Sequence, residues 1–563
     1  MTTAQERRRV RLASLGAGLA GAAVLVGVIT MAARLVGFGR WLVFSKTVGD
    51  TCLGDAYNTA NQLPNVLFEI VAGGALASVV VPVLAGAYAR GDEHGRAEAS
   101  RTMSALFTWT LLALTPVTLL AALLAAPYAR LMLAGQPGCP DGTSELAARM
   151  LLVFVPQIWC YGVAVVASGT LQAQRRFVAA AVAPLASSLV VVAAYAVFAL
   201  LAEGILDVDQ VPGSAVAVLA GGTTLGVLAL ALTVLVPLLR KGGGSFRPTL
   251  RFPPGVGQRV RGLATAGIVA LIAQQVVALV LTWLANHRGD AGTLTMYTWS
   301  FAVFALPYAV LAVPIVTSAF PDLAALARNG DGPDAQRRFG RLAATAVRTV
   351  ILLGALGGAL LAGTAQPVAR VFVLGPGGGD TRSLAWALLA FAPAVPALGV
   401  VTLAGRVLNA GGRHRLSAAG TALGWLTVAA CAVVVSGMVD ASLVAATLGA
   451  ATSAGLALGG ALLLLGVARA CGRAAVRGLT RVVIAGTVAG VIAGGAGAAV
   501  GRGFAGSSLT PAVLGALLSG LVVVAVFVGV AAVVDRPDAR AALARLRSRS
   551  RGTEGAAAGD DAA

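Results

Sequence analysis

Apolar segments of about twenty residues recur along the whole of this 563-residue chain. Because an α-helix rises about 1.5 Å per residue, about twenty residues cross the roughly 30 Å hydrocarbon core of a bilayer. The chain is 58% hydrophobic and only 12% charged. A soluble globular protein has about 25% charged residues, and a disordered chain has low hydrophobicity. The sequence therefore predicts an all-α polytopic membrane protein.

The breaks between apolar segments predict about fourteen membrane helices. Their expected ranges are 14–44, 55–88, 102–130, 148–169, 178–202, 213–238, 263–286, 294–321, 343–364, 383–408, 416–436, 441–467, 482–500 and 511–533.

The connections between these segments alternate in charge. Lys and Arg accumulate in the cytoplasmic connections of membrane proteins. The basic connections contain Arg7 to Arg11, Arg90 to Arg101, Arg175 and Arg176, Arg240 to Arg261, Arg328 to Arg341, Arg406 to Arg415, Arg469 to Arg481 and Arg536 to Arg551. The alternate connections are poor in cations and contain Asp50, Asp141, Glu145, Glu203, Asp207, Asp209, Asp290, Asp380 and Asp440. We therefore expect both termini in the cytoplasm, and the net charge of +19 requires no nucleic-acid partner.

Cys52 and Cys139 are two of the five cysteines and fall in the first two connections expected outside. A disulfide between them is one alternative in an oxidising compartment. Since spacing in the sequence does not establish that two cysteines are close, we favour two unpaired thiols.

An internal duplication relates the two halves of the chain. Phe154-x-Pro156 and Gly162-Val163 recur as Phe391-x-Pro393 and Gly399-Val400, at a constant offset of 237 residues, and Leu63-Pro64 corresponds to Leu306-Pro307. Six helices per repeat make the repeats parallel. The expected parts are an N-terminal lobe (1–238), a cytoplasmic linker (239–262), a C-terminal lobe (263–467), two extra helices (468–534) and a basic cytoplasmic tail (535–563).

The motifs of ATP-driven and covalent chemistry are missing from the sequence. It has no P-loop, no nucleophile elbow, and its three histidines lack metal-ligand spacing. We therefore expect no enzyme activity, no cofactor and no metal site. Transport by such a chain would draw on an ion gradient, the membrane potential or the gradient of its substrate.

One face of the second expected helix is polar. Asp55, Asn58, Gln62, Asn65 and Glu69 are spaced 3, 4, 3 and 4 residues apart, which places them along one side of a helix. Ionisable groups inside a bilayer are costly and usually functional. We interpret this stripe as the lining of a substrate cavity, the alternative being a seam of hydrogen bonds between helices.

Two arginines in the first expected helix are candidates for binding an anionic headgroup. Arg34 and Arg40 flank Gly37-Phe38-Gly39, which predicts a bend. A guanidinium binds phosphate through two hydrogen bonds and keeps its charge. The alternative is that these side chains reach to the membrane interface. Gln274 and Gln275 in the seventh expected helix are further candidates for the cavity lining.

Several motifs resemble the MurJ (MviN) family of lipid II flippases, within the multidrug/oligosaccharidyl-lipid/polysaccharide transporter superfamily. They are Ala33-Arg34-Leu35-Val36-Gly37-Phe38-Gly39-Arg40, Asp55-Ala56-Tyr57, Leu63-Pro64-Asn65, Gly74-Ala75 and Val81-Pro82-Val83-Leu84, with Val155-Pro156-Gln157-Ile158 and Leu306-Pro307-Tyr308 typical of the actinobacterial branch. The resemblance covers the first twelve expected helices.

The resemblance implies a V-shaped two-lobe transporter in the bacterial plasma membrane. Its substrate would be an undecaprenyl-diphosphate-linked glycan, in particular the peptidoglycan precursor lipid II, moved to the outer leaflet by alternating access. The partners would be this lipid and the membrane lipids, with cell-wall synthesis enzymes as further candidates. The resemblance also implies functional roles for Arg34, Arg40 and Asp55.

The chain departs from the family pattern at positions that carry charge. Phe68 and Glu69 stand where the family commonly has two arginines, Gly73 replaces a Glu, and Ala302 stands at a cavity arginine position. Two other functions stay open at this point. One is a proton-coupled drug or metabolite exporter that uses Glu69, and the other is a scaffold for cell-wall synthesis that does not transport.

Overall fold

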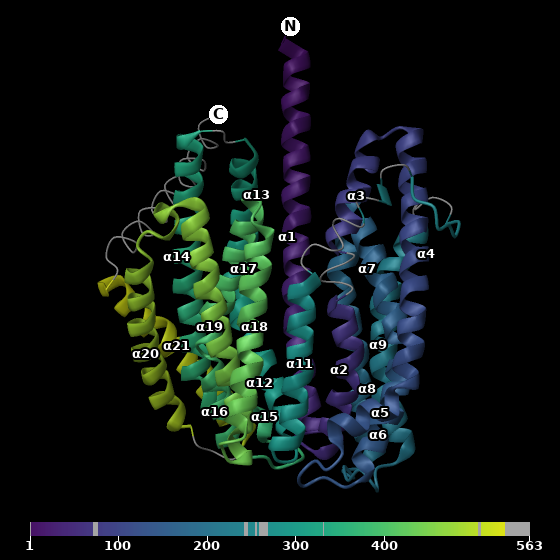
Figure 1. Cartoon of the computed structure of the whole chain (residues 1–563), viewed down its shortest axis with the longest axis vertical. Helices are drawn as coiled ribbons and strands as arrows, with labels where there is room; N and C mark the ends of the chain where they lie inside the picture. Colours follow the sequence, from purple (N-terminus) through teal and green to yellow (C-terminus); the bar gives the residue numbers. More distant parts are fainter. Residues whose placement is uncertain are drawn as a thin grey trace. The chain divides into compact units, whose positions relative to one another are not determined.

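The computed structural model describes residues 2–70, 77–240, 246–253, 256–257, 260, 268–329, 332–504 and 508–534. The described residues form helices joined by turns and short irregular segments, without strands (Figure 1). They divide into two compact units. Unit 1 contains residues up to Thr295 together with Gly375–Gly379, and unit 2 contains Met296–Leu374 and the residues from Asp380 onward.

Unit 1 is a bundle of helices with short connections. Its helices are α1 (Thr2–Thr47), α2 (Cys52–Glu69), α3 (Ala77–Arg90), α4 (Glu93–Leu123), α5 (Ala125–Leu133), α6 (Gly142–Phe154), α7 (Gln157–Ala173), α8 (Phe177–Ala202), α9 (Gly213–Arg240) and α11 (Ile268–Arg288). Its core includes Val80, Met103, Val166, Leu171 and Val234, which are contributed by α3, α4, α7 and α9.

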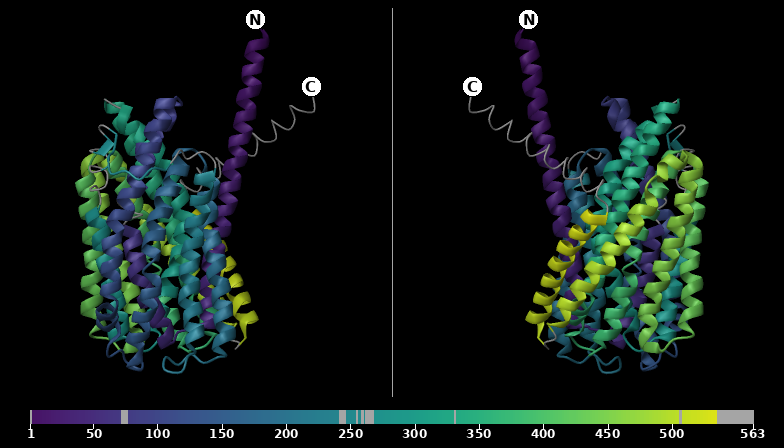
Figure 2. Two further views of the ribbon diagram at one scale, coloured as in Figure 1. Left: turned by 90° about the vertical axis from the view of Figure 1, so that its right-hand side faces the viewer. Right: turned by 90° about the vertical axis from the view of Figure 1, so that its left-hand side faces the viewer.

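Unit 2 repeats much of this arrangement. It contains most of α12 (Thr293–Pro307), a π-helical turn (Tyr308–Ala312), α13 (Val313–Asn329), α14 (Pro333–Gly363), α15 (Ala365–Val373), α16 (Thr381–Phe391), α17 (Ala394–Ala410), α18 (His414–Ser436), α19 (Val444–Cys471), α20 (Leu479–Arg502) and α21 (Leu509–Val534). The last two helices, yellow-green to yellow in Figure 2, pack on α14 through Ala359, Ala489, Ala493, Val523 and Phe527.

The predicted helical membrane fold is confirmed. Twelve helices of the described residues are long and apolar enough to cross a bilayer. The two other predicted segments, 55–88 and 263–286, correspond to α2 with α3 and to α11. The count of fourteen crossings and the lobe boundaries stay predictions, and the compact units divide after Thr295.

The duplication seen in the sequence is repeated in the helices. α4 and α14 both have 31 residues, α5 and α15 both have 9, and α7 and α17 both have 17. Pro156 precedes α7 and Pro393 precedes α17, so each proline interrupts its apolar segment at the same place. A proline lacks the N–H of a continuing helix, which explains both breaks. Pro64, by contrast, lies inside the unbroken α2.

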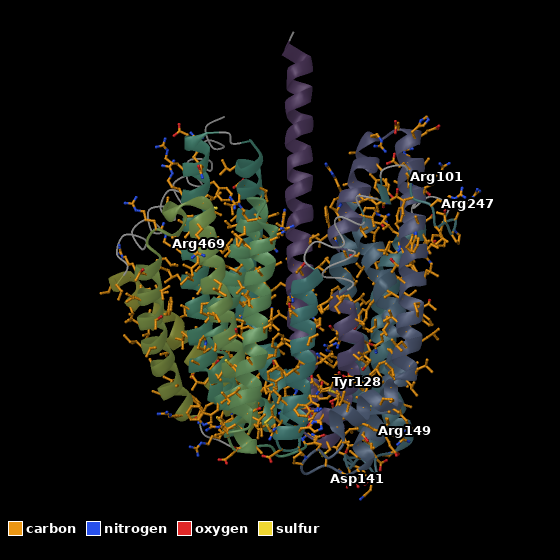
Figure 3. All side chains as sticks on the ribbon, viewed as in Figure 1. Arg101, Tyr128, Asp141, Arg149, Arg247 and Arg469 are labelled. Carbon is orange, nitrogen blue, oxygen red and sulfur yellow. A yellow bond between two sulfur atoms is a disulfide. The ribbon has the colours of Figure 1, made fainter. Side chains whose placement is uncertain are left out.

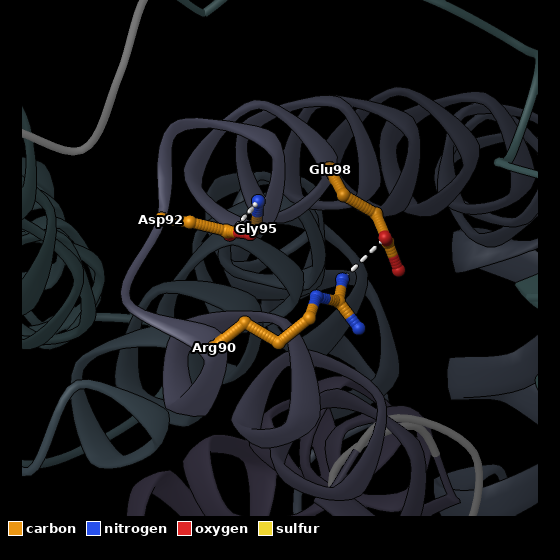
Figure 4. A network of polar contacts seen from close by, with 4 residues as sticks. All are labelled: Arg90, Asp92, Gly95 and Glu98. Atoms are coloured by element: carbon orange, nitrogen blue, oxygen red, sulfur yellow. Dashed lines mark hydrogen bonds and ion pairs between the residues drawn. The ribbon is translucent and has the colours of Figure 1, made fainter.

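The turn between α3 and α4 shows how a basic connection is built. Gly91 has φ +70°, a conformation that favours glycine. The Asp92 side chain accepts a hydrogen bond from the Gly95 N–H at 2.7 Å and so caps α4, while Arg90 forms an ion pair with Glu98 across the turn (Figure 4). In the second repeat of the sequence, Gly330 and Asp331 are equivalent to Gly91 and Asp92, and they lie outside the described residues.

The first helix differs from its prediction. α1 runs without interruption from Thr2 to Thr47 (Figure 1). Gly37-Phe38-Gly39 therefore does not end the helix, because a glycine weakens a helix by only about 1 kcal/mol. The predicted bend between Arg34 and Arg40 stays a prediction. The two arginines lie on one continuous helix.

The expectation of two unpaired thiols is wrong. Cys52, at the start of α2, and Cys139, between α5 and α6, form a disulfide with their Cα atoms 5.7 Å apart. The sequence separation of 87 residues gave no sign of this contact, which depends on how α2, α5 and α6 pack. The disulfide closes a loop that includes α2 to α5.

We expect Cys52→Ser to lower the stability of the protein by about 2–4 kcal/mol, because a cross-link over a long loop restricts the unfolded chain. Thermal unfolding in detergent, with and without reductant, measures this. Cys160→Ser is the matched control, since Cys160 is not cross-linked. Equal unfolding temperatures of Cys52→Ser and the wild type under oxidising conditions would contradict the assignment.

Candidate functional site

The predicted polar face of α2 exists, and its burial changes along the helix. Asp55 and Asn58 are buried, Gln62 and Asn65 are half-buried, and Glu69 is exposed. The start of α2 is therefore enclosed by protein, and its end is open. The two interpretations of the stripe, a hydrogen-bonded seam and a cavity lining, apply to different parts of the same helix.

Asp55 holds three segments of unit 1 together. One carboxylate oxygen accepts hydrogen bonds from the Gln136 side chain and the Gly292 N–H, both at 2.8 Å. The other accepts from the N–H and the hydroxyl of Thr295, at 3.0 and 2.8 Å. Asn58 donates to the same Thr295 hydroxyl at 3.0 Å. Because Asp55 is 0% exposed and has four donors, it is not available to a ligand in this conformation.

A second polar contact lies beside this one. The Asn286 side chain, near the end of α11, donates to the Thr59 hydroxyl at 2.9 Å and to the Met132 carbonyl at 3.0 Å. α11 thus packs against α2 and α5 through polar as well as apolar contacts. Sequence reasoning missed Gln136, Asn286 and Thr295, because uncharged polar residues at helix ends are common and carry little signal.

The turn that precedes α2 is enclosed by the glycine-rich segment Gly375–Gly379. Asp50 is 5% exposed, and burial raises the pKa of its carboxyl group above the ordinary value. Gly377 has φ +104°, and a Cβ atom there would lie 2.3 Å from Oδ1 of Asp50. Only glycine fits at this position.

Arg40 lies in a cluster of aromatic and hydroxyl side chains in unit 1. Its guanidinium carbon lies 5.2 Å from the centre of the Trp41 ring, and it interacts electrostatically with the phenol groups of Tyr57, Tyr161 and Tyr195. Among the described residues, its buried Nε has no hydrogen-bond acceptor. Arg40 as a whole is half-buried, so the terminal N–H groups of its guanidinium, and not the enclosed Nε, are the donors suited to an anionic ligand.

The tyrosines of this cluster, which we call the Arg40 cluster (Arg40, Tyr57, Tyr161, Tyr195 and Thr223), are themselves fixed. The Tyr57 hydroxyl lies 2.8 Å from both the Tyr195 and the Thr223 hydroxyls. Tyr161 donates to the side-chain oxygen of Asn65 at 3.2 Å. Through Asn65 the Arg40 cluster joins the open part of the α2 face. Tyr57 belongs to the Asp55-Ala56-Tyr57 motif of the family resemblance, whereas no motif pointed to Tyr161 or Tyr195.

The remaining predicted site residues are more dispersed. Arg34 is exposed on α1, about one and a half turns from Arg40. Gln275 is buried and Gln274 is half-buried in α11, a helix that contacts α2. Among the described residues, Glu69 has no ion-pair partner, and no group of three His, Cys, Asp or Glu side chains is suited to a metal.

The fold and these sites define a class: a polytopic helical membrane protein with duplicated bundles and a cationic, tyrosine-lined cluster in unit 1. The family described as "Lipid II flippase MurJ" matches residues 44–513. The chain belongs to this family. Gly73 lies outside the described residues. Phe68 packs against Tyr161, with tilted rings whose centres are 4.3 Å apart, so the position where the resemblance led us to expect an arginine forms an aromatic contact in this chain.

Curated relatives match part of the chain. A probable lipid II flippase MurJ from Rhizobium meliloti is 27% identical over 318 residues, which are 54% of this chain and 55% of the relative. Another from Synechocystis is 25% identical over 360 residues, 63% of this chain and 64% of the relative. The chain thus spans between about half and two thirds of the length of these relatives.

Solved structures show the same fold. The chain is similar to a lipid II flippase MurJ in an inward closed conformation, with a TM-score of 0.67 and 15% identity over 90% of this chain and 98% of the other. It is also similar to an inward-facing multidrug resistance MATE family transporter of the MOP superfamily. That match has a TM-score of 0.62 and 15% identity, over 80% of this chain and 98% of the other.

Proposed function

We propose that this protein moves a polyprenyl-diphosphate-linked glycan, lipid II in particular, from the inner to the outer leaflet of the bacterial plasma membrane. The observation that carries the proposal is the family match over residues 44–513, joined to the half-buried guanidinium of Arg40 in unit 1. Transport of this kind makes and breaks no covalent bond, in keeping with a sequence that lacks catalytic motifs.

In the proposed cycle, guanidinium groups of α1 bind the diphosphate. Arg40 supplies a charge already oriented by Trp41, and Arg34 supplies an exposed one. The open part of the α2 face, with Gln62 and Asn65, offers amides to the sugar or peptide groups. Asp55 and Asn58 contribute by fixing α2, since both are engaged in hydrogen bonds.

We further propose that both termini are cytoplasmic. Disulfides form and persist in oxidising compartments such as the periplasm. The Cys52–Cys139 disulfide therefore supports an outer position for the end of α1 and the start of α2. Asp141 lies at that end of unit 1, and Arg101 and Arg247 lie at the opposite end (Figure 3). Arg149 also lies near Asp141, so both ends of unit 1 carry arginine, and the two ends differ in how many basic residues they carry.

The test is depletion of this protein in its own host, followed by measurement of the leaflet that holds the lipid-linked precursor. We expect the precursor to accumulate in the inner leaflet, and a wild-type copy to restore its export. A drug exporter would instead change drug resistance and leave wall synthesis normal. A scaffold would still complement the depletion after its cluster residues were replaced by apolar ones.

The coupling proposal concerns Glu69. The membrane potential acts on a charged headgroup with about 2.3 kcal/mol per charge at 100 mV. Glu69 is the proposed proton carrier, because it is the acidic side chain at the open end of the α2 face and has no ion-pair partner among the described residues. We expect Glu69→Gln to make export independent of the proton gradient while leaving its dependence on potential. Export measured with each gradient collapsed separately checks this. Glu203→Gln is the control, because Glu203 lies in a loop and not on the α2 face. An unchanged response to the proton gradient in Glu69→Gln would exclude the proton role.

A further inference from the structure

The segment after α9 is attached to the side of α4. Residues 246–251, which we call the α4 strap, run alongside Ser104 to Trp109. The Arg247 N–H donates to the Ser104 hydroxyl at 3.3 Å, and the Thr249 N–H donates to the Thr108 hydroxyl at 3.2 Å. The Trp109 indole N–H donates to the Leu250 carbonyl at 3.0 Å. These side chains satisfy backbone groups of an extended segment that lies outside any sheet.

The sequence of the α4 strap suits this attachment. In an extended segment, alternate residues face the same side, so the N–H groups of positions 247 and 249 face α4 together. Position 248, between them, is a proline, which has no N–H to leave unpaired. Phe246 packs edge-on against Phe107 with ring centres 5.9 Å apart. The strap is therefore held at a defined level along α4.

That level is the start of the apolar part of α4, because the charged residues of this helix end at Arg101 and the segment from Thr102 to Leu123 contains none. An apolar helical segment of about twenty residues crosses the hydrocarbon core, so its first turns are expected at the membrane interface. Tryptophan is enriched at the interface, where its apolar ring and polar N–H both find partners. Trp109 is 44% exposed and Leu250 is 53% exposed, so both present apolar surface beside the strap.

Three exposed arginines belong to the same two segments. Arg101 lies one turn before Ser104 on α4, and Arg247 and Arg251 lie on the strap; all three are exposed. Arg101 and Arg247 are at the same end of unit 1 (Figure 3). Within the described residues none of the three forms an ion pair, and Glu98, one turn before Arg101, is already paired with Arg90 (Figure 4). The positive charge is therefore free for an external anion.

We propose that the α4 strap and α4 form a binding site for the phosphate headgroup of an anionic phospholipid of the inner leaflet. The guanidinium groups of Arg101, Arg247 and Arg251 bind the phosphate, and Trp109 and Leu250 contact the glycerol and upper acyl region. Charge complementarity and the interfacial level favour a lipid over a soluble anion. The bound lipid would fix the strap that follows α9 and precedes α11.

The test uses the full chain in nanodiscs of phosphatidylcholine with a minority of phosphatidylglycerol. Native mass spectrometry of the released protein counts each bound lipid. Each Lys or Arg near an anionic surface contributes about 1 kcal/mol, or about fivefold in affinity. We therefore expect Arg247→Gln to lower the preference for phosphatidylglycerol about fivefold, and the triple Arg101, Arg247 and Arg251→Gln variant to remove it.

Brominated phosphatidylglycerol locates the lipid, because bromine quenches nearby tryptophans. We expect it to quench a part of the emission that Trp109→Phe removes, and brominated phosphatidylcholine to quench that part less. Arg149→Gln, an exposed arginine at the opposite end of unit 1 (Figure 3), is the matched control and should keep the preference. An unchanged preference for phosphatidylglycerol in the triple variant would overturn the proposal. An equal loss of preference in Arg149→Gln would do the same, because the effect would not be specific to this site. Displacement of the lipid by glycerol phosphate would show that the site binds a soluble anion, which would also contradict the proposal.

Discussion

Replacing Arg40 by alanine is expected to reduce export of the lipid-linked precursor by about tenfold to a hundredfold, because a hydrogen bond to a charged group contributes about 1.5–3 kcal/mol. The Arg40 side chain stacks on Trp41 and keeps its Nε without an acceptor among the described residues. Its removal therefore takes away a binding group without leaving a buried partner unpaired. Complementation of depleted cells, with the leaflet distribution as readout, measures the effect.

Arg40→Lys separates charge from geometry. Lysine keeps the positive charge but lacks the planar fork that binds phosphate through two hydrogen bonds. We expect it to restore part of the export that Arg40→Ala loses. Arg502→Ala is the control, since that arginine ends α20 at a loop. Full export by Arg40→Ala, with normal amounts of protein in the membrane, would show that Arg40 does not bind the substrate.

Replacing Asp55 by alanine should act on stability and not on binding. The change leaves the donors of Gln136, Gly292 and Thr295 without their acceptors in a fully buried place. Each buried donor that loses its acceptor costs about 1–3 kcal/mol, so the loss is expected to amount to several kcal/mol for the three residues together. We expect a much lower unfolding temperature in detergent and less protein in the membrane.

Asn58→Ala is the matched comparison for Asp55→Ala, because Asn58 is on the same helix face and bonds to the same residue, Thr295, through one hydrogen bond. Its expected cost is about 1 kcal/mol. If Asp55→Ala unfolded at the wild-type temperature yet failed to export the precursor, Asp55 would be a ligand-binding residue, and its place in the buried network would have to change during transport.

The polar face of α2 serves two purposes along its length. Spacing of 3 and 4 residues placed Asp55, Asn58, Gln62, Asn65 and Glu69 on one face of α2, and that face is present. Which part of the face is enclosed depends on α5, α11 and the start of α12, whose positions no local pattern encodes. The enclosed part became a structural contact, and the open part remains the candidate binding surface.

Hydropathy and the repeat at an offset of 237 residues determined the helical membrane fold, the approximate limits of most apolar segments and the equivalence of Pro156 and Pro393, because these depend on patterns along the chain. Five predicted segments each contain parts of two α-helices: 55–88, 102–130, 148–169, 294–321 and 383–408. The motifs around Arg34, Arg40 and Asp55 were enough to indicate the family. Only the tertiary structure decided the Cys52–Cys139 disulfide, the four donors to Asp55, the Arg40 cluster and the attachment of residues 246–251 to α4. Each of these joins residues far apart in the sequence, and their contact follows from how helices pack, which side-chain volume and shape determine across the whole bundle.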